Sequence, residues 1–174
     1  MNTANKLTMV RIALIPIFLA VLYIGFLGSN YAAMGVFIIA GLTDMIDGYI
    51  ARSRNQVTDF GKFMDPLADK ALVVAAMIWF VEGGLMPAWA VIIVVMREFM
   101  VMALRLIAAT GGRVIAADIS GKIKTTVTML GLTVMFLSIP QWLVYVIIAL
   151  ITATTVISGV EYFVKNRDIL SGEK

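Results

Sequence analysis

Long apolar segments alternate with short polar ones along the whole chain. A helix that crosses a bilayer needs about 20 mostly apolar residues, and most of the runs come near that length. The pattern predicts an all-α integral membrane protein, a bundle of six transmembrane helices in which residues 1–174 form one domain. We expect the first run to be a retained span and not a cleaved signal peptide, because no small-x-small cleavage pattern is evident after it. The apolar runs are Leu7–Leu27, Ala32–Ile50, Leu67–Val81, Pro87–Thr110, Ile123–Ile139 and Trp142–Val164.

The charged residues between the spans are distributed unevenly. Three of the turns contain a single charge, Glu82, whereas the N-terminus, residues 52–62, residues 113–124 and the tail after Val164 are rich in Lys and Arg. Cytoplasmic loops carry the excess of Lys and Arg, so both termini are predicted to be cytoplasmic. Tryptophans flank the poorly charged turns, as interfacial aromatic residues do.

The composition narrows the chemistry. With 61% hydrophobic and 14% charged residues, the chain cannot present the surface of a soluble domain. It has 0 Cys and 0 His, which excludes disulfides, zinc sites built on those residues and an imidazole base. The net charge of +3 comes from basic residues that border the spans, so it indicates contact with membrane lipids and no nucleic acid.

Four aspartates form the most informative pattern. Asp44 and Asp47 are three residues apart, and Asp65 and Asp69 are four apart, so each pair shares one face of a helix. The short basic segment between the pairs makes their helices antiparallel neighbours, and the four acids then converge. Carboxylates without His or Cys suit hard divalent cations such as Mg²⁺ or Mn²⁺. The alternative is a polar cluster with salt bridges to nearby Lys and Arg residues.

Small and basic residues accompany the acids. Gly48, Ala51 and Gly61 leave room for a polyphosphate to approach the backbone, or they allow close helix packing. Arg52 lies on the helical face of Asp44 and can reach phosphate oxygens, or it serves as a positive-inside anchor. Pro66 allows two interpretations: a helix begins at Pro66 with Asp65 as its cap, or it begins nearer Asp59 and bends at the proline.

The complete pattern resembles a known family signature. Asp44 to Arg52, eight further residues and Gly61 to Asp69 read D-x-x-D-G-x-x-A-R, then G-x-x-x-D-x-x-x-D. This resembles, without departure, the signature of the CDP-alcohol phosphatidyltransferase family. Looser matches at residues 5–11, 15–16, 97–98 and 121–125 resemble bacterial members of the family that use glycerol 3-phosphate. Thr3-Ala4 departs from the Ile-Pro expected there.

The resemblance implies a six-helix homodimer with two divalent metal ions in a bacterial cell membrane, its active site facing the cytoplasm. It implies that Asp44, Asp47 and Asp65 bind metal and that Asp69 is the catalytic base and also a possible metal ligand. The substrates would be CDP-diacylglycerol and sn-glycerol 3-phosphate, and the products phosphatidylglycerol phosphate and CMP. The resemblance also implies that Gly48, Arg52 and the Thr58 hydroxyl hold the CDP part of the substrate, with Asn5 and Thr8 near it. The alternative is that Thr58 is a turn residue and that Asn5 and Thr8 are helix caps.

The phosphate of the acceptor requires cations. Arg105, Arg113, Lys122 and Lys124 flank one cytoplasmic loop and are predicted to form an anion pocket, although topology or lipid headgroups also explain them. Arg97 and Glu98 lie within a span, where they pair with other charges or Arg97 lines the site.

Two alternative functions remain open. In the first, the enzyme carries out the same chemistry with inositol phosphate, serine or a second lipid as the acceptor. In the second, the protein is a cation transporter whose buried aspartates form the ion path.

Overall fold

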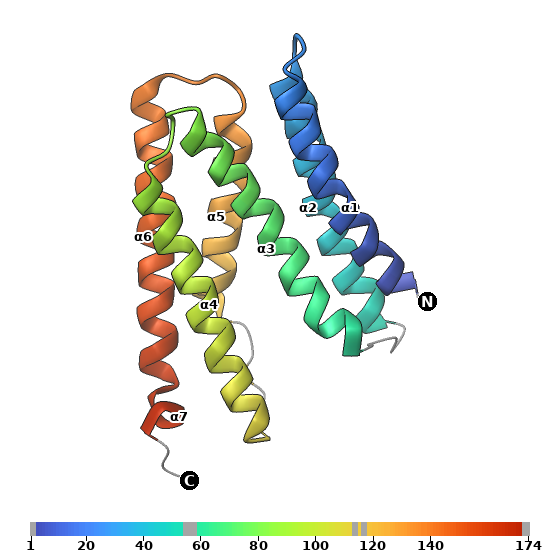
Figure 1. Cartoon of the computed structure of the whole chain (residues 1–174). Coiled ribbons are helices and arrows are strands. Elements are labelled where there is room, and N and C mark those ends of the chain that lie inside the picture. The colour runs from blue at the N-terminus through green and yellow to red at the C-terminus, as the bar shows by residue number, and fades with distance from the viewer. Residues whose placement is uncertain (1–2, 54–58, 113–114, 116–117, 172–174) are drawn as a thin grey trace. The chain divides into compact units, whose positions relative to one another are not determined.

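The computed structural model describes residues 3–53, 59–112, 115 and 118–171. For residues 3–8, 11, 44–53, 59–66, 69, 170 and 171 it describes the backbone alone. Every regular element in the described residues is a helix, as predicted (Figure 1). The helices are α1 (Thr3–Ile24), α2 (Ser29–Ser53), α3 (Asp59–Glu82), α4 (Ala88–Thr110), α5 (Ile119–Met135), α6 (Gln141–Lys165) and α7 (Arg167–Ser171).

The first six helices correspond to the six predicted apolar runs, and the short helix α7 was not predicted. Helices α4 and α6 begin directly after Pro87 and Pro140, where the missing proline N–H costs no helical hydrogen bond. Helix α3 begins at Asp59, eight residues before its apolar run. Of the two interpretations of Pro66, the one with an earlier helix start is therefore correct.

The chain divides into two compact units, residues 1–79 with 133–139, and residues 80–132 with 140–174. In the first unit, Phe18 of α1, Phe37 of α2 and Phe136 form an aromatic core in which each side chain is at most 1% exposed. Their ring centroids are 6.0 to 6.1 Å apart, and the ring of Phe136 meets that of Phe18 edge-on. Such tilted and edge-on pairs are favourable beyond the area they bury.

Two glycines make the turn between α1 and α2 possible. Gly25 and Gly28 have φ values of +66° and +88°, in the left-handed region that residues with a Cβ rarely adopt. The amide of Ser29 donates to the carbonyl of Phe26 at 2.9 Å and closes the turn. The reversal makes α1 and α2 an antiparallel pair.

In the second unit, α4 and α6 pack against each other. Val101 and Leu104 of α4 form a buried cluster with Tyr162 of α6. Helix α5 approaches α6 at Gly131, where a Cβ atom would lie 2.8 Å from Cγ2 of Ile147 and 3.2 Å from Cδ1 of Ile151. The missing side chain thus permits this close approach, as small residues do between membrane helices.

Helix α6 is the helix in the described residues that is both long and apolar enough to cross a membrane on its own. The stretches Ile12–Ile24 and Ser29–Thr43 are shorter apolar helices. Helix α4 has the length, but Arg97, Glu98 and Arg105 lie within it. These apolar helices are consistent with a membrane protein.

We expect Gly131→Ala to destabilise the protein, because overpacking a tight helix contact costs about 1–3 kcal/mol and exceeds the roughly 0.5–1 kcal/mol that alanine gains over glycine in a helix. Gly35→Ala is the matched control, since no atom lies within 4 Å of a Cβ built at Gly35. Thermal unfolding in detergent should give a lower midpoint for Gly131→Ala and an equal or higher one for Gly35→Ala. A Gly131→Ala protein as stable as the parent would contradict the tight contact.

Candidate functional site

The signature aspartates lie on two consecutive helices. Positions 44 and 47 are in α2, and positions 65 and 69 are in α3, which begins six residues after α2 ends. On a helical backbone, residues three or four apart share a face, so each pair has the predicted arrangement on its own helix. Six chain steps span at most about 22 Å, which limits the distance between the facing ends of the two helices.

Contacts in the first unit place both pairs at the same end of that unit. Tyr23, near the end of α1, packs edge-on against Trp79, near the end of α3, with ring centroids 5.4 Å apart, and Figure 1 shows that α1 and α3 run in the same direction. The antiparallel α2 runs the other way. The beginnings of α1 and α3 and the end of α2 therefore lie together, as Figure 1 also shows.

Helix lengths refine this placement. Phe18 and Phe37 are in contact, and about 15 Å of helix separates Phe18 from Thr8 and Phe37 from Asp47. Asp65 precedes Trp79 by 14 residues, or about 21 Å, which brings it to nearly the same level as Thr8. The aspartates and the predicted CDP-binding positions of α1 therefore lie toward the same end of these helices.

Many predicted site residues lie outside the described side chains. Thr58 and Arg113 are outside the described residues altogether. The described side chains include no group of three or more Asp or Glu residues that could hold a metal ion. The side chains of the four signature aspartates are not among the described ones. Their roles stay predictions. The predicted site residues of which only the backbone is described are Asn5, Thr8, Asp44, Asp47, Gly48, Ala51, Arg52, Gly61, Asp65 and Asp69.

The predicted acceptor cations fall into two environments. Arg105 and Lys122 are exposed. Lys124 is 5% exposed and donates to Glu98 Oε1 at 2.5 Å. Lys122 and Lys124 are two residues apart on α5, and residues at that spacing do not face the same way.

Arg97 and Glu98 belong to a buried charge cluster that joins three helices. Arg97 of α4 donates through Nη1 to Glu98 Oε1 at 3.1 Å, and through Nη2 to Ser158 Oγ of α6 at 2.5 Å. Lys124 of α5 binds the same Glu98 oxygen. The side chains of Arg97, Glu98 and Lys124 are 12%, 11% and 6% exposed. Of the two predicted roles for Arg97 and Glu98, pairing with other charges is confirmed.

Two glycines leave space for the Arg97 side chain in this buried charge cluster. A Cβ atom at Gly159 of α6 would lie 3.2 Å from Arg97 Cγ, closer than most side-chain contacts. At Gly121 of α5, a Cβ atom would lie 3.6 Å from Arg97 Nη2. The side chain thus lies against glycine backbone on both neighbouring helices.

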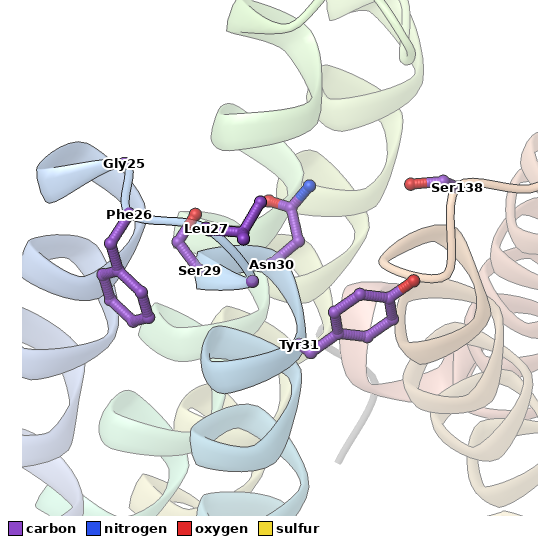
Figure 2. A pocket seen from close by; sticks show the side chains of 8 residues that line it. Gly25, Phe26, Leu27, Ser29, Asn30, Tyr31 and Ser138 are labelled. Atoms are coloured by element: carbon purple, nitrogen blue, oxygen red, sulfur yellow. The ribbon is translucent and has the colours of Figure 1, made fainter.

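A shallow hollow of about 390 Å³ lies at the other end of the first unit (Figure 2). It is lined by the turn between α1 and α2, residues 25–31, and by Ser138. About 22 Å of α2 separates this turn from Asp44. The hollow is therefore not part of the aspartate site.

Comparison with known proteins identifies the family. The model of the CDP-alcohol phosphatidyltransferase family matches residues 1–158 of this chain. The chain belongs to the CDP-alcohol phosphatidyltransferases. It is 46% identical to the CDP-diacylglycerol–glycerol-3-phosphate 3-phosphatidyltransferase of Bacillus subtilis over 97% of each chain.

Other bacterial relatives agree. A protein of Mycobacterium tuberculosis named probable phosphatidylglycerophosphate synthase is 38% identical over 97% of this chain and 83% of its own. The CDP-diacylglycerol–glycerol-3-phosphate 3-phosphatidyltransferase of Escherichia coli K12 is 37% identical over 90% of this chain and 88% of its own. The resemblance drawn from the aspartate motif is thereby confirmed.

Sequence reasoning missed several polar contacts of this phosphatidyltransferase. Neither Ser158, which binds Arg97, nor Tyr162, whose hydroxyl accepts from Arg105 Nε at 2.9 Å, stood out in an apolar run. A single polar residue in a span is a weak signal of such contacts.

A second ion bridge lies at the surface. Lys165 Nζ at the end of α6 donates to Asp118 Oδ2 at 2.9 Å and to Glu161 Oε1 at 2.6 Å. The hydrogen bond from Lys165 lowers the pKa of the Asp118 carboxyl from its ordinary value. The Lys165 side chain is 51% exposed, so this bridge contributes less to stability than the buried charge cluster.

We expect Glu98→Ala to destabilise the transferase strongly, by about 3–5 kcal/mol, because it removes the carboxylate that a buried ammonium and a buried guanidinium both contact. Lys165→Ala breaks an ion bridge at the surface and should change stability little. Unfolding in detergent, followed by circular dichroism, compares the two.

The double variant Glu98→Leu/Lys124→Leu should recover part of the loss, since the Lys124 ammonium is no longer left buried without a carboxylate, while Arg97 keeps its hydrogen bond to Ser158. Equal effects of Glu98→Ala and Lys165→Ala would show that the buried charge cluster does not stabilise the fold.

Proposed function

We propose that this chain transfers the phosphatidyl group of CDP-diacylglycerol to sn-glycerol 3-phosphate, forming phosphatidylglycerol phosphate and CMP. The observation that carries the proposal is the complete aspartate signature, whose backbone positions on α2 and α3 lie toward one end of the first unit. Relatives of 37 to 46% identity that bear the name of this reaction support the choice of acceptor.

Two divalent metal ions, Mg²⁺ or Mn²⁺, would be held by Asp44, Asp47, Asp65 and Asp69. The donor set fits such ions, because it consists of carboxylates alone and the chain contains 0 His and 0 Cys. When bound, the metals would neutralise the diphosphate and the departing CMP. Their presence in the protein is part of the proposal.

The chain's own residues would perform the remaining steps. Asp69 accepts the proton of the primary hydroxyl of glycerol 3-phosphate while that oxygen forms a bond to the lipid-side phosphorus. The bond from this phosphorus to the bridging oxygen breaks, and CMP leaves with the electron pair. Arg52 would bind phosphate oxygens, and Gly48 and Gly61 would leave room for the diphosphate.

The remaining predicted contacts are assigned by their position. Asn5, Thr8, Ala51 and Thr58 would contact or border the CDP part. Arg105 and Lys122 are exposed cations, which supports a role in binding the acceptor phosphate, and Arg113 lies between them in the sequence. Lys124 already donates to the carboxylate of Glu98, so a role for Lys124 in binding the acceptor phosphate has less support.

We also propose a multi-pass protein of a bacterial cell membrane, with six spans, both termini and the active site in the cytoplasm, and a homodimeric assembly. Helices α1 to α6 contain 17 to 25 residues each, which is close to the thickness of a bilayer. The asymmetric Lys and Arg distribution supports the orientation.

The activity can be tested by CMP release from CDP-diacylglycerol in mixed micelles. Glycerol 3-phosphate, serine, inositol phosphate and a second lipid are offered separately, with Mg²⁺, with Mn²⁺ or with a chelator. We expect release with glycerol 3-phosphate and metal alone. Asp69→Asn should lower turnover by roughly 10²- to 10⁴-fold, since the amide cannot accept the proton. Asp168→Asn, outside the signature, is the matched control.

CMP release with a different acceptor would show that the acceptor is wrongly assigned and that the reaction class is correct. Well-folded protein that releases no metal-dependent CMP with any acceptor would contradict the transferase. Cation flux into liposomes would then favour the transporter alternative.

The orientation can be tested with single cysteines, because the chain has 0 Cys. We expect a membrane-impermeant maleimide to label Asn30→Cys, in the α1–α2 turn region, in intact bacterial cells with a permeable outer layer. Ser171→Cys, near the C-terminus, should be labelled only after the membrane is opened. The reverse pattern would place the termini outside the cytoplasm.

A further inference from the structure

Arg105, the exposed cation on α4, makes an unusual contact with a buried phenol. Its Nε donates to the hydroxyl of Tyr162 on α6 at 2.9 Å, and its guanidinium carbon lies 5.5 Å from the centre of that ring. In the described part of the chain, these are the polar and cation–π contacts of Arg105. We propose that Tyr162 is a positioning residue that holds Arg105 ready for the phosphate of the acceptor, an inference that rests on the proposed function.

Tyr162 is well placed to be a rigid support. Its side chain is 2% exposed and packs with Val101 and Leu104 of α4. Its backbone carbonyl accepts a hydrogen bond of 2.8 Å from Nδ2 of Asn166, which is itself 7% exposed. A tyrosine has only two side-chain torsions, and packing on a helix limits both. The hydroxyl therefore has a defined position from which to orient a flexible partner.

The atom that donates to Tyr162 determines what Arg105 can still bind. A guanidinium has five N–H donors in one plane, and the bond to the phenol uses the single one on Nε. The four N–H groups of Nη1 and Nη2 are left, and two of them point forward in parallel. This terminal pair matches two oxygens of a phosphate, so the contact with Tyr162 selects the edge that can bind an anion in bidentate fashion.

The energetic benefit lies in conformational entropy. An exposed arginine that binds an anion must give up side-chain freedom, and each ordered side chain of this kind lowers affinity. If Tyr162 already orders Arg105, most of that cost is met before the acceptor arrives. The acceptor phosphate stays bound in the ground state and in the transition state alike, so the effect should appear in KM for glycerol 3-phosphate and not in kcat.

The test is Tyr162→Phe in the full-length protein, which removes the hydroxyl and keeps the ring in the buried cluster. We expect KM for glycerol 3-phosphate to rise by roughly three- to tenfold, with kcat and KM for CDP-diacylglycerol unchanged. Tyr145→Phe is the matched control, because it makes the same change on α6 at a residue that is 62% exposed. It should leave all three parameters unchanged.

A double-mutant cycle distinguishes positioning from a general loss of packing. Tyr162→Phe acts through Arg105 in our proposal, so it should have no further effect on KM in an Arg105→Ala background. Arg105→Lys replaces that background if the alanine variant has no measurable turnover, because lysine has no Nε donor. A full, additive effect of Tyr162→Phe in either background would overturn the proposal.

The outcomes separate this inference from the proposed function. An unchanged KM in Tyr162→Phe, together with a raised KM in Arg105→Ala, would refute the positioning role and keep Arg105 as a phosphate ligand. An unchanged KM in Arg105→Ala would remove Arg105 from the acceptor site and refute the positioning role with it. A parent protein without transferase activity would refute the proposed function itself.

Discussion

The buried charge cluster of Arg97, Glu98, Lys124 and Ser158 is the interaction on which the second unit depends. Charges within an apolar bundle are costly unless they are paired, and here one carboxylate oxygen receives both a guanidinium and an ammonium group. Because the four residues come from α4, α5 and α6, these helices cannot shift past one another without exposing a charge to apolar surroundings. Apolar packing alone would fix the relative position of these helices much less strictly, because lipid can replace an apolar neighbour such as a leucine side chain at little cost.

The same chain uses its few polar residues in two further environments. The signature aspartates lie in the first unit, in the C-terminal half of α2 and the N-terminal half of α3. Arg105 lies on an exposed surface, held by a hydroxyl group and not by a carboxylate. The positive charge of a cation held by a neutral partner is not offset, whereas the charge of one held by a carboxylate is offset by that carboxylate. This difference separates Arg105 from Lys124, although both are basic residues near one loop.

Much of this could be predicted from the sequence. The apolar runs predicted six helices, because an apolar run is a local signal. The start of α3 was left open between Asp59 and Pro66, since no apolar period runs through its first turns. The burial of Lys124 was not predicted either. It depends on Glu98, which is 26 residues away in the chain, and no local pattern reports a contact of that kind.

The glycine at position 159 carries a consequence for how this protein can change over generations. With Arg97 in place, a Cβ atom at this position would lie 3.2 Å from the arginine Cγ, so an alanine there requires the arginine stem to shift by a few tenths of an ångström. If Arg97 were first replaced by a smaller residue, the same alanine would fill a vacancy and become favourable. The order of the two substitutions therefore decides whether a lineage passes through a damaged intermediate. Arg97 and Gly159 should be inherited as a pair.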